Sequence, residues 1–119
     1  MLALATRRRS QPAPPWAVLE ALLRPDRDPA RPWLLPGPGE VRPLVLEEGP
    51  AHVLWSSPWP DRPGLRVRLD VTARPDGAVG ADLRWTLLAD APLPVEEVRP
   101  LRRRLDELLN RDLRQSFDQ

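Results

Sequence analysis

The C-terminal stretch Val95–Phe117 decides the fold, and its sequence is VEEVRPLRRRLDELLNRDLRQSF. Its apolar residues recur at steps of mostly three and four, and they are Val98, Leu101, Leu105, Leu108, Leu109 and Leu113. Because an α-helix completes a turn about every 3.6 residues, this spacing predicts a helix with one apolar stripe. Such a helix is marginal alone in water, so the stripe requires a partner surface. Proline fits best in a first helical turn, so Pro100 predicts that the residues before it form a separate turn or precede a kink.

The clearest partner for this helix is a pair of alternating segments, 65–73 and 81–87. Each places an apolar residue at every second position, which is the pattern of a strand with one buried face. Between them, Pro75-Asp76-Gly77 suits a three-residue hairpin loop with glycine in the left-handed position. That loop predicts the facing pairs Val71–Ala81, Leu69–Leu83, Val67–Trp85 and Asp70–Asp82.

A second hairpin is predicted around Glu48-Gly49-Pro50, with strands over 41–47 and 52–57. Its register would place Leu46 opposite Val53 and Leu44 opposite Trp55 on one apolar face. The other face also carries apolar residues, namely Val41, Val45 and Leu54. Exposed apolar surface of this kind often marks an interface, so this hairpin supports the hypothesis of a homodimer.

The N-terminal part of the chain predicts one further strand and short helices. Leu2–Arg9 is a candidate strand, and Pro15 opens a helix over Trp16–Arg24. Asp28–Trp33 is long enough for another helical turn, and Pro36–Gly39 is a loop on its turn chemistry. Together with the two hairpins, this predicts an α+β fold of about five strands and a long C-terminal helix.

Length and composition restrict the class of protein. A chain of 119 residues suits a single domain, 1–119, with one core. No apolar run is long enough to span a bilayer, so we expect no membrane insertion. In Met1–Arg9 the apolar residues precede the basic ones, the reverse of a secretory signal, and we therefore expect a cytoplasmic protein. The net charge of +1 argues against a dedicated nucleic-acid binder.

Few residues are candidates for catalytic or metal chemistry. With no cysteine and one histidine, His52, the sequence predicts neither a metal site nor a cofactor. Strand alternation puts His52 on the face opposite Trp55, about 13 Å along the strand from Ser56, too far for a nucleophile–base pair. We therefore assign no catalytic residue from the sequence.

Three segments carry a resemblance to a known family: VLWSS at 53–57, LRWTLL at 83–88 and LRRRLDELLNRDLR at 101–114. The chain resembles the actinobacterial branch of the SRPBCC superfamily, also described as START-like, Bet v 1-like or polyketide cyclase/dehydrase-like. The resemblance implies a helix-grip fold, in which a curved antiparallel sheet wraps around the C-terminal helix. It also implies a hydrophobic cavity between them, where members hold lipids, polyketides or other apolar molecules. This chain has fewer strands than the family usually has, so its cavity is small, open at one side, or filled by its own side chains.

These observations predict a protein that binds a small hydrophobic ligand, lipid- or polyketide-like, between the sheet and the helix. The inward positions predict the lining residues Val53, Trp55, Val67, Leu69, Leu83, Trp85, Leu105 and Leu109. The indole N–H groups would orient the ligand, although both indoles equally suit the core of a small domain. Two alternatives stay open. One is a polyketide cyclase- or dehydratase-like enzyme, which needs an acid–base group in the cavity, and the other is an interaction or dimerisation module with a collapsed cavity.

Overall fold

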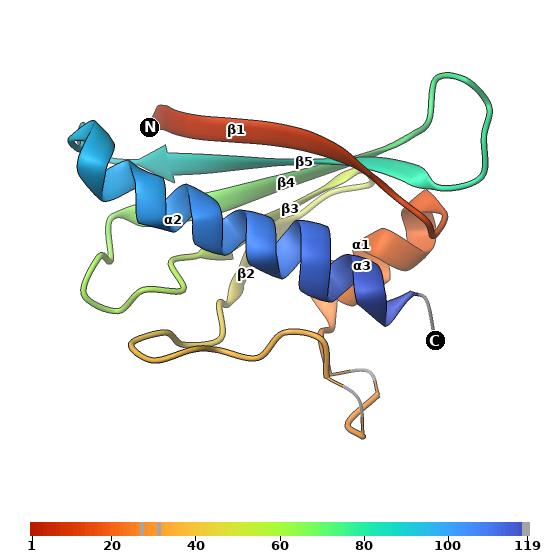
Figure 1. Cartoon of the computed structure of the whole chain (residues 1–119), viewed down its shortest axis with the longest axis horizontal. Helices are drawn as coiled ribbons and strands as arrows, with labels where there is room; N and C mark the ends of the chain where they lie inside the picture. Colours follow the sequence, from red (N-terminus) through yellow and green to blue (C-terminus); the bar gives the residue numbers. More distant parts are fainter. Residues whose placement is uncertain (27, 31, 118–119) are drawn as a thin grey trace.

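The computed structural model describes residues 1–26, 28–30 and 32–117, and Figure 1 shows their arrangement. In this part of the chain the strands are β1 (Leu2–Gln11), β2 (Val45–Glu48), β3 (His52–Ser56), β4 (Leu65–Ala73) and β5 (Ala81–Ala89). The helices are α1 (Pro15–Leu23), α2 (Val95–Glu107), the π-helical turn η1 (Leu108–Asp112) and α3 (Leu113–Ser116). The strands form one antiparallel sheet in the order β1-β5-β4-β3-β2. The continuous run α2–η1–α3 lies across one face of that sheet, which is the predicted α+β helix-grip architecture (Figure 1).

One apolar core fills the space between the sheet and the helix. β4 and β5 bury every second side chain toward it, as their alternating sequences predict. The helical run contributes its leucine stripe, Leu101, Leu105, Leu108, Leu109 and Leu113, each at most 7 % exposed. The short helix α1 adds Val18 and Leu22, which are both fully buried. The stripe therefore has the partner surface that an amphipathic helix of this length requires.

The start of the long helix differs from the prediction. α2 runs without a break from Val95, although Pro100 lies inside it. The carbonyl of Pro94 accepts the N–H groups of Glu97 and Val98 at 3.0 and 3.1 Å, which secures the first turn. Because proline has no backbone N–H, Pro100 leaves only the carbonyl of Glu96 without its helical donor, and Glu96 is exposed to water. The helix thus tolerates the proline without a separate first turn.

The register of the β4–β5 hairpin also differs from the prediction. Its facing pairs are Ala73–Ala81, Val71–Leu83, Leu69–Trp85, Val67–Leu87 and Asp70–Arg84. The connecting loop is therefore longer than three residues and includes a second glycine with positive φ, Gly80 (114°), besides Gly77 (73°). A Cβ on Gly80 would collide with the backbone oxygen of Gln11, so contact with the end of β1 fixes this longer loop. A shift of two residues keeps the buried faces aligned, and it replaces the predicted Asp70–Asp82 repulsion by an opposite-charge pair.

The first strand of the other hairpin is shorter than predicted. β2 pairs with β3 through Val45–Trp55, Glu47–Leu54 and Glu48–Val53, with a bulge between Val45 and Glu47. The predicted inward positions of Leu44 and Leu46 are wrong, because these side chains are 70 % and 47 % exposed. Beyond the bulge, the Ser56 N–H donates to the Leu44 carbonyl at 2.9 Å, and the Leu44 N–H donates to the Ser56 hydroxyl at 2.8 Å rather than to a backbone carbonyl. Val41 and Val45 are exposed as well.

The N-terminal elements follow the prediction closely. β1 pairs with β5 along its whole length, and α1 begins at Pro15 as expected. The further helical turn predicted at Asp28–Trp33 is not seen at Asp28–Ala30, which form a turn closed by the Asp28 carboxylate and the Ala30 N–H (3.1 Å). Arg31, the next residue of that prediction, lies outside the described residues. Within the described ranges, none of the helices has the length and apolarity needed to cross a bilayer.

Candidate functional site

The eight predicted ligand-binding residues come together in the core. Val53 and Trp55 lie on β3, Val67 and Leu69 on β4, Leu83 and Trp85 on β5, Leu105 on α2 and Leu109 on η1. All eight are at most 1 % exposed. The surface depression described below is lined by other residues. That these eight side chains contact a ligand therefore stays a prediction.

The indole groups of the core are bonded to the protein itself. Trp55 Nε1 donates to the carbonyl of Leu22 at 3.2 Å, and Trp85 Nε1 donates to Asp106 Oδ1 at 3.1 Å. Their N–H groups are thus used in holding α1 and α2 against the sheet. Because both indole N–H groups donate within the protein, they are not free to orient a ligand in the way that the sequence analysis proposed.

Asp106 accepts hydrogen bonds from three donors where the helix packs on the sheet. Its Oδ2 accepts from Arg7 Nη1 on β1 at 2.7 Å, and its Oδ1 accepts from Trp85 Nε1 and from Asn110 Nδ2 at 3.0 Å. The side chain of Asp106 is only 25 % exposed. This carboxylate fixes the helix relative to β1 and β5. Sequence reasoning missed it because Arg7 and Asp106 are 99 residues apart.

A large depression lies between the segment after α1 and the end of the helical run. It has a volume of about 930 Å³, which is within the roughly 300–1,000 Å³ of ligand pockets. One wall is apolar and is built by Ala21, Pro25, Pro32, Trp33 and Leu35. The other residues are polar: Arg111 and Asp112 of η1, Gln115 and Ser116 of α3, and Asp28 from the turn after α1. We call this depression the cleft.

Trp33 anchors the apolar wall of the cleft. Its indole N–H donates to the carbonyl of Ala21 at 2.9 Å, and its ring stacks on Trp55 with centroids 6.3 Å apart and planes 25° apart. Trp33 is 8 % exposed, whereas Leu35 beside it is 61 % exposed. The wall is therefore rigid at its base and open at its rim. Trp33 lies in a Pro-rich loop without strand or helix periodicity, so the sequence offered no signal for its role.

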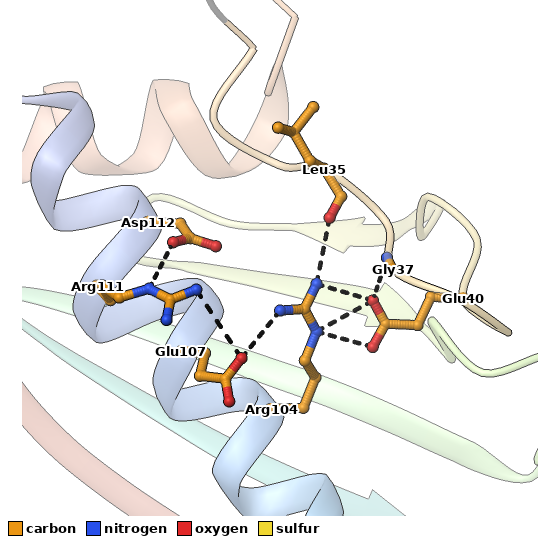
Figure 2. A network of polar contacts seen from close by, with 7 residues as sticks. All are labelled: Leu35, Gly37, Glu40, Arg104, Glu107, Arg111 and Asp112. Carbon is orange, nitrogen blue, oxygen red and sulfur yellow. Dashed lines mark hydrogen bonds and ion pairs between the residues drawn. The ribbon is translucent and has the colours of Figure 1, made fainter.

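A polar network holds the rim of the cleft to the helix, as Figure 2 shows. Arg104 on α2 contacts both carboxylate oxygens of Glu40, through Nε at 2.8 and 3.1 Å and through Nη2 at 2.9 Å. Its Nη2 also donates to the carbonyl of Leu35 at 3.2 Å. Glu107 then joins Arg104 at 3.2 Å to Arg111, which pairs with Asp112 at 2.9 Å. This network ties the rim residue Leu35 to the polar wall of the cleft.

Two opposing effects act on Glu40. Burial raises the pKa of Glu40, but hydrogen bonds from Arg104 and from the Gly37 N–H outweigh it, so the pKa lies below its ordinary value of 4.5. The same hydrogen bond, which Arg104 donates to Glu40, raises the pKa of Arg104 against the opposing effect of burial. Both groups are therefore charged at neutral pH, and the network is a true ion pair.

The π-helical turn η1 borders the cleft. Its defining bond runs from the Leu113 N–H to the Leu108 carbonyl, five residues back. Such turns are rare and often lie at functional sites. The spacing of Leu101, Leu105, Leu109 and Leu113 is a signal for it in hindsight. Four-residue steps drift by about 40° each in an α-helix, and a wider turn brings Leu113 back to the core.

His52 lies away from the cleft, on the sheet face opposite Trp55, as the alternation predicted. Its Nε2 is 2.8 Å from Glu47 Oε2. Within the described residues, no group of three or more His, Asp or Glu side chains is placed to hold a metal ion. The cleft is therefore the arrangement with the clearest capacity to hold a molecule.

Comparisons with known proteins bear on the fold. No protein-family model matches the sequence, and no curated protein sequence matches it either. Among solved structures, the Aha1 dimer from Colwellia psychrerythraea is similar, with a TM-score of 0.62, 16 % identity and 92 % of each chain covered. Ara h 8.0201 has a TM-score of 0.58 and 14 % identity over 97 % of each chain. At these TM-scores the similarity shows that the chain has a Bet v 1-like, helix-grip fold.

A third similar structure, CalU16 from Micromonospora echinospora, has a TM-score of 0.57 and 22 % identity. It aligns with 87 % of this chain and with 70 % of its own. The expected helix-grip fold is thus confirmed, with the C-terminal helix across the five-stranded sheet. At these identities the likeness concerns the fold, and the function has to be argued from the cleft itself.

Proposed function

We propose that this Bet v 1-like domain binds a small ligand that has an apolar body and a polar end, and that the ligand occupies the cleft. The observation that supports this is the pairing of a fixed aromatic wall, Trp33 on Trp55, with a polar wall on η1 and α3. Apolar surface of the ligand would be buried on Trp33 and Leu35, at roughly 25 cal/mol per Å². Its polar end would meet Arg111 and Gln115.

The eight predicted core residues enter this proposal as the region behind Trp33. Trp55 stacks directly on Trp33, so it is the core residue that supports the wall of the cleft. A ligand that extended past Trp33 would contact the eight core residues next. The predicted interior site is therefore the deeper part of the site that we propose. An enzymatic role has less support, because both carboxylates of the cleft make local contacts, Asp112 with Arg111 and Asp28 with Ala30.

Binding of the fluorescent probe 8-anilinonaphthalene-1-sulfonate tests the proposal, because the probe combines an apolar ring system with an anionic group. We expect the wild-type protein to bind it, and Leu35→Glu to weaken binding at least about tenfold by placing a charge on the apolar wall. Val79→Glu is the matched control, since Val79 is 84 % exposed on the β4–β5 loop and does not line the cleft. No binding by the wild type, or equal affinity in the two variants, would refute the cleft as the site.

A second proposed function is self-association through β2 and the residues before it. Val41, Leu44, Val45 and Leu46 are 40–70 % exposed within six residues, and β2 is an edge strand. Contiguous exposed apolar residues at a sheet edge favour contact with another copy. The similar structure from Colwellia psychrerythraea is a dimer, which is in keeping with this proposal.

Light scattering over a range of concentrations tests self-association. We expect the mass of the wild-type protein to rise toward that of a dimer, and Leu44→Glu to shift it to the monomer. Val95→Glu is a suitable control, because Val95 is similarly exposed (66 %) but lies at the start of α2. A monomer mass for the wild type at high concentration would exclude this proposal.

A further inference from the structure

The turn η1 leaves one backbone carbonyl without its helical donor. In an α-helix the Leu113 N–H would donate to the carbonyl of Leu109, but here it donates to that of Leu108. Leu109 is fully buried, so water does not replace the missing donor. A buried carbonyl without a partner is costly, and the π-helical form needs a donor from elsewhere.

Gln11 supplies that donor from the sheet. Its Nε2 lies 2.9 Å from the Leu109 carbonyl oxygen, across 98 residues of sequence. β1 places it there, because Gln11 is the last residue of β1 and faces Ala81 at the start of β5. Pro12 follows immediately and ends the strand, which fixes the side chain at this point.

The oxygen atom of the same side-chain amide shows that a glutamine at position 11 is not explained by its contribution to the stability of the protein. Gln11 is 1 % exposed, and its Oε1 has no hydrogen-bond partner among the described residues. An orphaned buried acceptor destabilises a protein relative to an apolar side chain of similar shape. The bond from Nε2 to Leu109 is the contribution that an apolar residue would not make.

This bond also sets the direction of the polar wall of the cleft. Arg111 and Asp112 belong to η1, and Gln115 and Ser116 follow it. If the Leu113 N–H donated to the Leu109 carbonyl, as in an α-helix, the turn would contain one residue fewer. Residues after the turn, among them Gln115 and Ser116, would then rotate by about 100° around the helix axis, which would turn their side chains away from the cleft.

We propose that Gln11 is a positioning residue, which holds η1 in its π-helical form and thereby sets the polar wall that a ligand of the cleft would meet. Its effect on ligand binding rests on the proposed function, whereas its effect on η1 does not. Gln11 itself does not line the cleft and acts through the helix.

The experiment compares Gln11→Met, which keeps the length of the side chain but has no donor, with Thr6→Val. Thr6 also lies on β1 and donates to a backbone carbonyl, that of Trp85 at 2.9 Å, but this bond goes to β5 and not to η1. In Gln11→Met we expect hydrogen exchange of the Leu113 amide to change about tenfold or more, and binding of 8-anilinonaphthalene-1-sulfonate to weaken about tenfold. Thr6→Val should leave both within about twofold of the wild type.

The possible outcomes separate the two claims. Unchanged exchange at Leu113 in Gln11→Met overturns the role of Gln11 in η1, and changed exchange with unchanged probe affinity overturns its role in the cleft. If the wild type binds no probe, the proposed function fails, while the exchange data still decide the role in η1. If Gln11→Met does not fold, exchange of the Gln11 carboxamide protons in the wild type decides instead. Slow exchange supports the buried bond to Leu109, and fast exchange overturns it.

Discussion

Arg104 and Glu40 show how much one pair of residues contributes to the cleft. They are 64 residues apart, and their side chains are only 21 % and 9 % exposed. The guanidinium contacts both oxygens of the carboxylate, a planar two-point contact that lysine would not reproduce. Through the Leu35 carbonyl, the same guanidinium also holds the rim of the cleft (Figure 2).

We expect Glu40→Gln to lower the free energy of unfolding by about 1–3 kcal/mol at neutral pH, because it leaves Arg104 without its charged partner. The pKa of Glu40 is lowered on folding, so this stabilisation is present above the ordinary value of 4.5. It is lost as the pH falls through the lower value of the folded state, where the carboxylate takes up a proton. The difference between the variant and the wild type should therefore shrink in acid.

Urea unfolding at neutral and at acid pH checks this. Glu20→Gln serves as the control, because it removes an exposed i,i+4 pair with Arg24 (3.0 Å) that is worth less than about 0.5 kcal/mol. Equal losses in the two variants, or a loss in Glu40→Gln that persists in acid, would contradict the expectation.

At the scale of elements, α2 carries a proline inside a helix that packs on the sheet. Replacing it by alanine would restore an N–H donor for the Glu96 carbonyl and remove the clash of the ring with the preceding turn. We expect Pro100→Ala to raise the free energy of unfolding by about 1–2 kcal/mol, a gain reduced by the greater freedom of the unfolded chain.

Pro15→Ala is the matched control for this change. Pro15 is the first residue of α1, where proline has no N–H to lose and its φ suits the helix. That variant should be neutral or slightly destabilised in the same urea measurement. Destabilisation by Pro100→Ala would show that Pro100 is favourable where it lies, contrary to this interpretation.

The elements also show what the sequence could reveal. Period-two and period-3.6 patterns predicted β4, β5 and the long helix, because burial on one face dictates those periods. The register of β4 and β5 was missed by two residues, since it depends on contact between Gly80 and the end of β1. The inward positions of Leu44 and Leu46 were wrong, because a bulge within an edge strand leaves no trace in the alternation.

For the whole molecule, the architecture was predictable and the cleft was not. The resemblance of a few core segments was enough to indicate the helix-grip fold. The cleft joins residues of the loop after α1 to residues of η1 and α3, at opposite ends of the sequence. Its walls depend on Trp33 packing on Trp55 and on Arg104 reaching Glu40. Such contacts between distant, aperiodic segments carry no local pattern that reasoning from one sequence could use.

The pairing of β1 with β5 has a consequence for biosynthesis. Thr6 and Thr86 touch in the sheet although 80 residues separate them in the chain. During synthesis on a ribosome, the N-terminal strand therefore cannot pair with β5 until most of the polypeptide has emerged. The helix that covers the apolar face emerges later still. During that interval the nascent chain exposes its indoles and leucines, and this is the period in which chaperones would be of most use to it.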